Sequence, residues 1–202
     1  MVDLLMLFAG ALLIVERRTP RILIAYVVLA ATASIFILPS ALESPLALAL
    51  FALSSLVKLV VVPVGILLFL RANPAASDLR PSIGLPARIV LVVAFASIAR
   101  AVGHSAALAP VPMQGMVAYV VLCSVGMLIV HRNLLAQVMG LLALGAGITL
   151  AGATLAPALP ESVELGATFD ALVATFIGLA LVRAFVAENP VLDVESLRRL
   201  RG

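Results

Sequence analysis

Residues 141–155 read LLALGAGITLAGATL, an uncharged stretch inside a longer apolar segment. Its small residues recur at steps of four, with Ala143, Gly147 and Ala151 in one row. Glycine in a helix interior costs about 1 kcal/mol in water, but in lipid this spacing lets helix backbones approach closely. The stretch therefore predicts a tightly packed membrane helix. Its expected packing glycines are Gly140, Gly145, Gly147 and Gly152.

The composition predicts that the rest of the chain is also a membrane protein. Apolar residues make up 64% of it and charged residues 11%, whereas soluble domains carry about 25% charged residues. A span needs roughly 17–25 apolar residues to cross about 30 Å of hydrocarbon. We therefore expect an all-α, polytopic helix bundle. Seven spans fit, at about 2–15, 21–39, 45–70, 88–108, 114–130, 134–156 and 165–187.

The orientation follows from the cations, because Lys and Arg in short loops stay on the cytoplasmic side. Eleven arginines flank alternate connections, whereas the other loops have acidic residues instead. We expect the N-terminus outside and the C-terminus in the cytoplasm. The arginines are Arg17, Arg18, Arg21, Arg71, Arg80, Arg88, Arg132, Arg183, Arg198, Arg199 and Arg201, and the acidic residues are Glu43, Glu161 and Glu164.

The chain is expected to form one membrane domain, with helices one to four in 1–108, three further helices in 114–187 and a cytoplasmic tail in 188–202. GALLIVERR (10–18) and GMLIVHRN (126–133) both end a helix before a basic turn. Helices one to three are thus candidates for a repeat of helices five to seven, although any alternating membrane protein has a similar rhythm. The connection 71–88 and the tail are candidate contacts for a cytoplasmic partner.

Polar side chains inside the spans are the candidate functional residues, because a charge in the bilayer persists only when it is paired or functional. The candidates are Lys58, Arg100, His104 and Asp170. A carboxylate near a movable cation can relay protons, and Pro63 would free a backbone carbonyl near Lys58. The other explanation is that these charges only tie helices together.

Catalysis by this chain alone is not expected. The chain has one cysteine, Cys123, and no cluster of cysteines and histidines that would ligate a metal. No nucleophile with an adjacent base and no phosphate-binding loop is recognisable. We expect no cofactor and no nucleic-acid partner, because the basic pI is explained by the cytoplasmic arginines.

Two C-terminal segments, HRNLLAQVMGLLALGAGITLAG (131–152) and LPESVELGATFDALVATFIGLALV (159–182), resemble the hydrogenase-4 component E family. That family is related to the K-type subunit of complex I and to the C-type subunit of multisubunit cation/proton antiporters. The Lys58 to Pro63 segment resembles it more loosely. The positions that fit the family pattern are Gln137, Gly140, Gly147, Glu164, Gly166 and Asp170.

The resemblance implies a membrane-arm subunit of a hydrogenase-4-like or complex-I-like oxidoreductase in a bacterial inner membrane. Its implied partners are antiporter-like membrane subunits and a hydrogenase-like or dehydrogenase-like arm on the cytoplasmic side. The chain has Gly145 where the family has a membrane glutamate, which puts a complete proton path in doubt. The alternative is a subunit of a cation/proton antiporter, or a free-standing ion carrier.

Overall fold

The computed structural model describes residues 2–73, 81–104, 114–155 and 160–188. Apart from isolated bridges, such as the one between Pro81 and His131, every regular element in these ranges is a helix. The expected tail and the middle of the 71–88 connection lie outside the described residues. The helices are α1 (Val2–Val15), α2 (Thr19–Ala41), α3 (Pro45–Leu56), η1 (Val57–Val61), α4 (Val62–Ala72), α5 (Leu85–Gly103), α6 (Gln114–Val130), α7 (Leu134–Leu155) and α8 (Pro160–Glu188).

These helices form the predicted polytopic membrane bundle. The elements α3, η1 and α4 join into one apolar rod, Pro45–Ala72, so the described helices match the seven expected spans. Five of them are long and apolar enough to cross a membrane. The other two, α1 and α6, are shorter; the 14 residues of α1 rise about 21 Å, less than the roughly 30 Å of hydrocarbon.

Predicted boundaries differ by several residues at two spans: α8 begins at Pro160 where the prediction begins at 165, and the fourth span differs at both ends. The sequence predicts this span at 88–108, but α5 begins at Leu85 and ends at Gly103. Proline is tolerated in the first turn of a helix, where its missing N–H has no helical partner in any case. Pro86 occupies this position in α5. The helix therefore begins before the proline, and Arg88 belongs to its first turn and not to the preceding loop.

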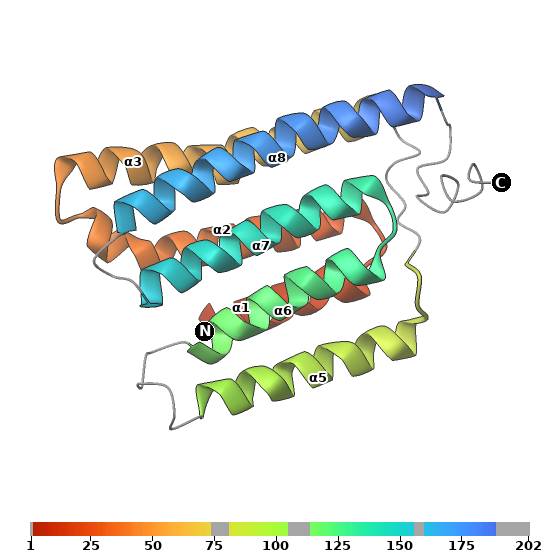
Figure 1. The fold of residues 1–202 in the computed structure, drawn as a ribbon, viewed down its shortest axis with the longest axis horizontal. Helices are drawn as coiled ribbons and strands as arrows, with labels where there is room; N and C mark the ends of the chain where they lie inside the picture. The colour runs from red at the N-terminus through yellow and green to blue at the C-terminus, as the bar shows by residue number, and fades with distance from the viewer. Residues whose placement is uncertain (1, 74–80, 105–113, 156–159, 189–202) are drawn as a thin grey trace.

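The bundle is two layers of helices with α5 at one edge (Figure 1). Helix α1 lies beside α6, α2 beside α7, and the α3 rod beside α8. In the internal repeat suggested by the sequence, the two helices of each pair correspond to each other. Helix α5 packs against α6 and α1, at the opposite edge from α8. A duplicated three-helix unit plus one additional helix stays a prediction.

Hydroxyl groups in the interior are satisfied mainly within their own helices. Thr32 Oγ1 donates to Val28 O at 2.8 Å, and Ser124 Oγ donates to Val120 O at 2.8 Å. A buried donor without an acceptor is costly where water is absent, and a bond to the preceding turn satisfies it locally. The interior therefore tolerates serines and threonines without needing a polar partner on another helix.

The glycines of α7 differ in what surrounds them. A Cβ at Gly147 would lie 3.1 Å from Val121 Cγ2, and one at Gly140 would lie 2.5 Å from Leu128 Cδ2. Both glycines therefore allow α7 to lie close to α6. Gly152 is half-buried. Gly145 is different, because a Cβ there would meet no atom within 4 Å. Close packing accounts for two of the expected packing glycines and does not account for Gly145.

Candidate functional site

A pocket of about 310 Å³ opens between α2, η1, α7 and α8. Its lining is mostly aliphatic, with three polar side chains contributed by different helices. These are Tyr26 of α2, Lys58 of η1 and Asp170 of α8. Gly145 of α7 also lines it. The fold therefore brings together two of the sequence candidates, Lys58 and Asp170, and the glycine at the position of the family glutamate.

Lys58 lies in a local widening of the third rod. Residues Val57–Val61 form a π-helical turn, and Val62 N–H bonds to Val57 O. Pro63 has no N–H to donate to the preceding turn, and a proline is a common cause of irregular winding in a helix. The sequence expectation that Pro63 disturbs the backbone near Lys58 agrees with this geometry. Such turns occur often at functional sites.

The Lys58 side chain is buried, with 5% of its surface exposed. Its Nζ donates to Thr149 Oγ1 at 3.4 Å. Thr149 Oγ1 in turn donates to Gly145 O at 2.9 Å, one turn earlier in α7. A polar chain thus runs from the lysine to the backbone of the glycine. Thr149 was not among the sequence candidates, because a lone threonine in an apolar helix has no distinguishing pattern.

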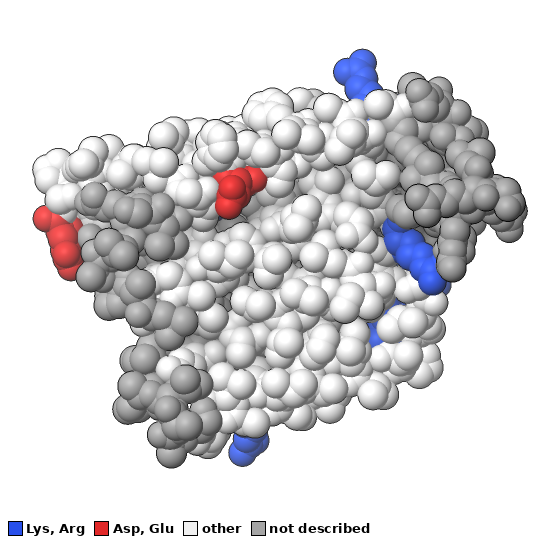
Figure 2. All heavy atoms as spheres, in the orientation of Figure 1, with Lys and Arg blue, Asp and Glu red and all other residues white. Residues whose placement is uncertain are grey.

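Asp170 lies at the exposed side of this pocket. Asp170 is an exposed residue of α8. Figure 2 shows that most of the face drawn there is uncharged, with acidic side chains near its middle and at one edge and basic side chains toward other edges. The neighbouring side chains Phe169 and Val173 are apolar and exposed. A carboxylate in such surroundings is costly unless it is paired with a polar or cationic group.

The remaining candidates lie away from the pocket. Arg100 and His104 are exposed on α5, and His104 Nδ1 lies 2.7 Å from Arg100 O. Gln137 Nε2 donates to Leu128 O and His131 O, both at 2.8 Å, so its amide closes the turn between α6 and α7. Glu164 lies in α8, but its side chain is outside the described residues. Arg100 lies on α5, which packs against α6 and α1, at the opposite edge of the bundle from the Asp170 helix α8 (Figure 1).

Sequence reasoning missed a second polar cluster, at the end of the bundle where the chain turns from α1 to α2 and from α6 to α7. His131 is fully buried, and its Nε2 lies 3.2 Å from Glu16 O. Its Nδ1 has no hydrogen-bond partner among the described residues. Burial lowers the pKa of His131, and the bond to the Glu16 carbonyl offsets only part of this effect. In the neutral imidazole, the contact with the Glu16 carbonyl places the proton on Nε2, because a carbonyl oxygen only accepts.

Ser82 binds the same turn. Its N–H and its Oγ both donate to Val130 O at 2.8 Å. The end of α6 is thus tied to the segment before α5, while His131 ties it to the end of α1. No local pattern in the sequence indicates these contacts, because each joins segments that are far apart in the chain.

The fold and this pocket define a multi-pass helical membrane protein with a buried lysine and an exposed aspartate at one cavity. A family model described as NADH-ubiquinone/plastoquinone oxidoreductase chain 4L matches residues 112–202. The matched region contains α6, α7 and α8. No curated protein and no solved structure matches the chain significantly.

The match covers a little under half of the chain, including two of the helices that line the pocket. This C-terminal part is similar to the chain 4L family. The similarity supports a membrane-arm subunit of a respiratory oxidoreductase-like complex, with membrane partners. The helices before residue 112 lie outside the matched region.

Proposed function

We propose that the protein is a membrane-arm subunit of a hydrogenase-4-like or complex-I-like oxidoreductase, and that it takes part in proton translocation. Redox chemistry belongs to other subunits in this proposal. The observation that carries it is the pocket that Lys58 and Asp170 both line, in a chain whose C-terminal part is similar to chain 4L.

The proposed role of the pocket rests on its electrostatics. The proton affinity of a carboxylate rises when a nearby cation moves away and falls when the cation returns. Lys58 can supply that cation, because a lysine has a flexible stem and loses its proton more readily than an arginine when buried. Asp170 supplies the carboxylate. Movement of the lysine between Thr149 and the aspartate would couple proton uptake to a change in the surrounding subunits.

The glycine at position 145 fits this reading. The resemblance implies a glutamate there, and the position faces the pocket with open space around it. The proposal is that Asp170, on the facing helix, carries the acidic function that the resemblance assigns to position 145. The open space then provides room for water, which a proton path between separated groups needs.

The exposed position of Asp170 supports a proposal for where a partner subunit binds. A charged side chain at the centre of a membrane helix costs roughly 2.5–3.5 kcal/mol on insertion scales, and Asp170 lies about one turn from the centre of the span Leu165–Ala184. A partner helix with a basic side chain removes this cost by pairing with the carboxylate. We therefore propose that an antiporter-like subunit covers the face of α7 and α8 around Asp170.

The assembly is tested by affinity purification of the full chain from its native membrane in a mild detergent. We expect a large antiporter-like subunit and a cytoplasmic redox arm to copurify. A lone, stable protein would overturn the proposal and favour a free-standing ion carrier. Antiporter subunits without any redox partner would favour a cation/proton antiporter.

The role of the pocket is tested in the same assembly with Asp170→Asn. The relay requires that the assembly is retained while proton translocation, measured with a pH-sensitive dye in vesicles, is lost. If the charges only tie helices together, reversing Lys58 and Asp170 singly should abolish assembly and reversing both should restore it. If Asp170→Asn retains both the assembly and normal proton translocation, the relay is ruled out.

A further inference from the structure

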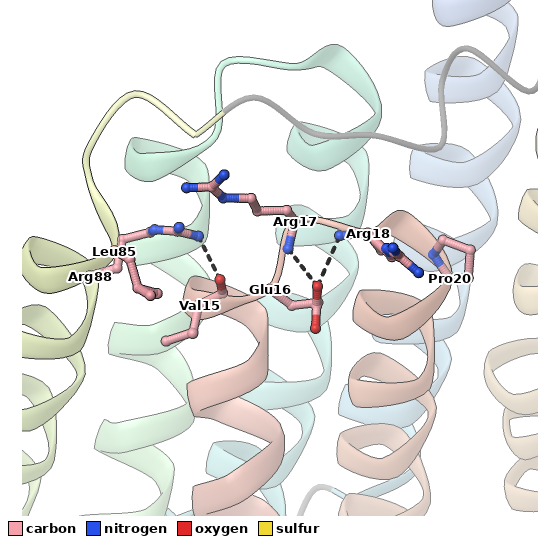
Figure 3. A pocket seen from close by; sticks show the side chains of 7 residues that line it. All are labelled: Val15, Glu16, Arg17, Arg18, Pro20, Leu85 and Arg88. Atoms are coloured by element: carbon pink, nitrogen blue, oxygen red, sulfur yellow. Dashed lines mark hydrogen bonds between the residues drawn. The ribbon is translucent and has the colours of Figure 1, made fainter.

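A second pocket, of about 790 Å³, lies at the end of the bundle where α1 turns into α2, between that turn and the first turn of α5 (Figure 3). Of the residues that the structure describes, three arginines and one glutamate line it. The lining residues are Val15, Glu16, Arg17, Arg18, Pro20, Leu85 and Arg88. Its volume is in the range of small-molecule sites, about 300–1,000 Å³. Neither the proposed proton path nor the match to residues 112–202 involves these residues.

Arg88 is the innermost of the three cations and is fully buried. Its Nη1 donates to Val15 O at 2.5 Å and lies 3.5 Å from Ile14 O. These are carbonyls of the last turn of α1, which carry only a partial negative charge. Its Nε has no partner among the described residues. The positive charge of Arg88 is therefore only partly balanced by the protein.

Glu16 supplies only part of the missing negative charge, because it acts on Arg88 from a distance while its oxygens are bound elsewhere. Its Oε2 accepts from Arg21 Nη1 at 3.0 Å, and the two form an ion pair. Its Oε1 accepts from the backbone N–H groups of Arg17 at 2.9 Å and Arg18 at 3.3 Å. The carboxylate is thus engaged by Arg21, which does not line the pocket, and by the turn itself. The side chains of the three lining arginines leave an excess of positive charge.

The arginine side chains are arranged around one space. Figure 3 shows Arg17 extending over Val15 toward Arg88, while Arg18 points toward Pro20. Arg17 and Arg88 act on each other as like charges. Two guanidinium groups that approach each other in a pocket are stabilised by an anion that accepts from both, and phosphate oxygens match this fork geometry.

The pocket lies at the depth expected for lipid headgroups. Val15 ends α1, Pro20 lies in the first turn of α2, and Leu85 begins α5, so helix ends surround it. Exposed apolar side chains follow on both neighbouring spans, Ile24 on α2 and Ile89 on α5. A ligand with a phosphate in the pocket and acyl chains along these helices would neutralise the arginines and cover the apolar side chains. Basic pockets between membrane helices on the cytoplasmic side bind anionic headgroups in this way.

We propose that this pocket binds a phosphate group, carried by an anionic phospholipid of the leaflet at this end of the bundle. The bound lipid neutralises Arg17 and Arg88 and bridges the α1–α2 turn to α5. This inference does not depend on the proposed proton path, because it concerns the opposite edge of the bundle and a different set of residues.

The test is native mass spectrometry of the full chain, in the assembly with which it copurifies, after delipidation in detergent. Dioleoylphosphatidylglycerol and inorganic phosphate are the two probes, added separately. The double variant Arg17→Gln/Arg18→Gln removes two exposed charges without touching the buried Arg88. The matched control is Arg71→Gln, which removes an exposed arginine near the end of α4 that does not line the pocket.

We expect the phospholipid to bind the parent protein and Arg71→Gln equally, and the double variant about tenfold more weakly, since each interfacial cation contributes to binding. Arg88→Gln should weaken binding further if it folds, which circular dichroism checks. Equal binding to all variants, or equal loss in the double variant and in Arg71→Gln, would overturn the proposal. Inorganic phosphate that binds with the same variant dependence, while the phospholipid does not bind, would keep the phosphate site and overturn the lipid as its source.

Discussion

Lys58 and Thr149 are joined by a hydrogen bond between Nζ and Oγ1 at 3.4 Å, although 91 positions separate them in the chain. The contact connects the π-turn of the third rod to α7 beneath the pocket. It gives the buried lysine a polar neighbour that is itself anchored, because Thr149 donates onward to Gly145 O. The lysine is thus held at the wall of a cavity that the aspartate also lines.

Thr149→Val should weaken this connection without changing the shape of the site much. The lysine loses an acceptor, so we expect the free energy of unfolding to fall by about 1–2 kcal/mol, between the values for membrane hydrogen bonds and those for charged groups. Reversible unfolding in mixed micelles measures it. Thr154→Val is the control, because Thr154 donates to carbonyls of its own helix at Leu150 and Ala151. An equal effect of both substitutions would contradict the prediction.

Gly145→Ala and Gly10→Ala should differ, because the two glycines have different surroundings. A Cβ at Gly10 would lie 2.6 Å from the Tyr119 ring, and that ring is held by a bond from its hydroxyl to Leu7 O at 3.0 Å. Overpacking of this kind costs about 1–3 kcal/mol. Gly145→Ala meets open space and should leave the unfolding free energy almost unchanged. A loss at position 145 similar to that at position 10 would contradict this reading of the pocket.

Gly145→Glu tests the chemistry of the same position. A Cβ at position 145 would meet no atom within 4 Å, so the glutamate side chain can enter the pocket without a clash at its first atom. Lys58 lines the same cavity. We expect a normal assembly with altered proton translocation, because the new carboxylate competes with Asp170 for the lysine. Gly145→Gln has nearly the same size without the charge and is the control. Failure of both variants to assemble would show that space, and not charge, limits this position.

His131 should make stability depend on pH in a defined window. Its pKa is lowered by burial from a usual value of 6.5, so the unfolded chain binds a proton that the folded chain does not as the pH falls below about 6.5. The stabilisation is complete above 6.5 and is lost progressively toward the folded pKa. Thermal unfolding between pH 7.5 and about 5 should show this decline.

The control for this prediction is the other histidine. The chain has 2 histidines, and His104 is exposed. His131→Gln keeps an N–H group for the Glu16 carbonyl and should reduce the loss of stability at low pH, whereas His104→Gln should leave that loss unchanged. Glu16 titrates in a separate, lower pH range. Burial raises its pKa, but hydrogen bonds from Arg17, Arg21 and Arg18 outweigh this effect and lower its pKa below 4.5. An unchanged decline in His131→Gln would contradict the assignment.

The sequence alone determined the helical membrane architecture and most of its boundaries. The span predicted at 114–130 coincides with α6, and 2–15 coincides with α1. The reason is that in lipid each span must satisfy its backbone within its own helix and match the hydrocarbon thickness, and both constraints are local. The boundary of α5 was less accurate because a proline can either end a connection or begin a helix.

The sequence also indicated Lys58 and Asp170, because charges in apolar spans are conspicuous. Only the tertiary structure decided that these two share a pocket while Arg100 lies at the other edge of the bundle. The same holds for Arg88, which the sequence assigned to a loop and which is buried against the end of α1. Which helices become neighbours depends on the packing of their faces across long separations in the chain. Composition and spacing within one helix do not contain that information.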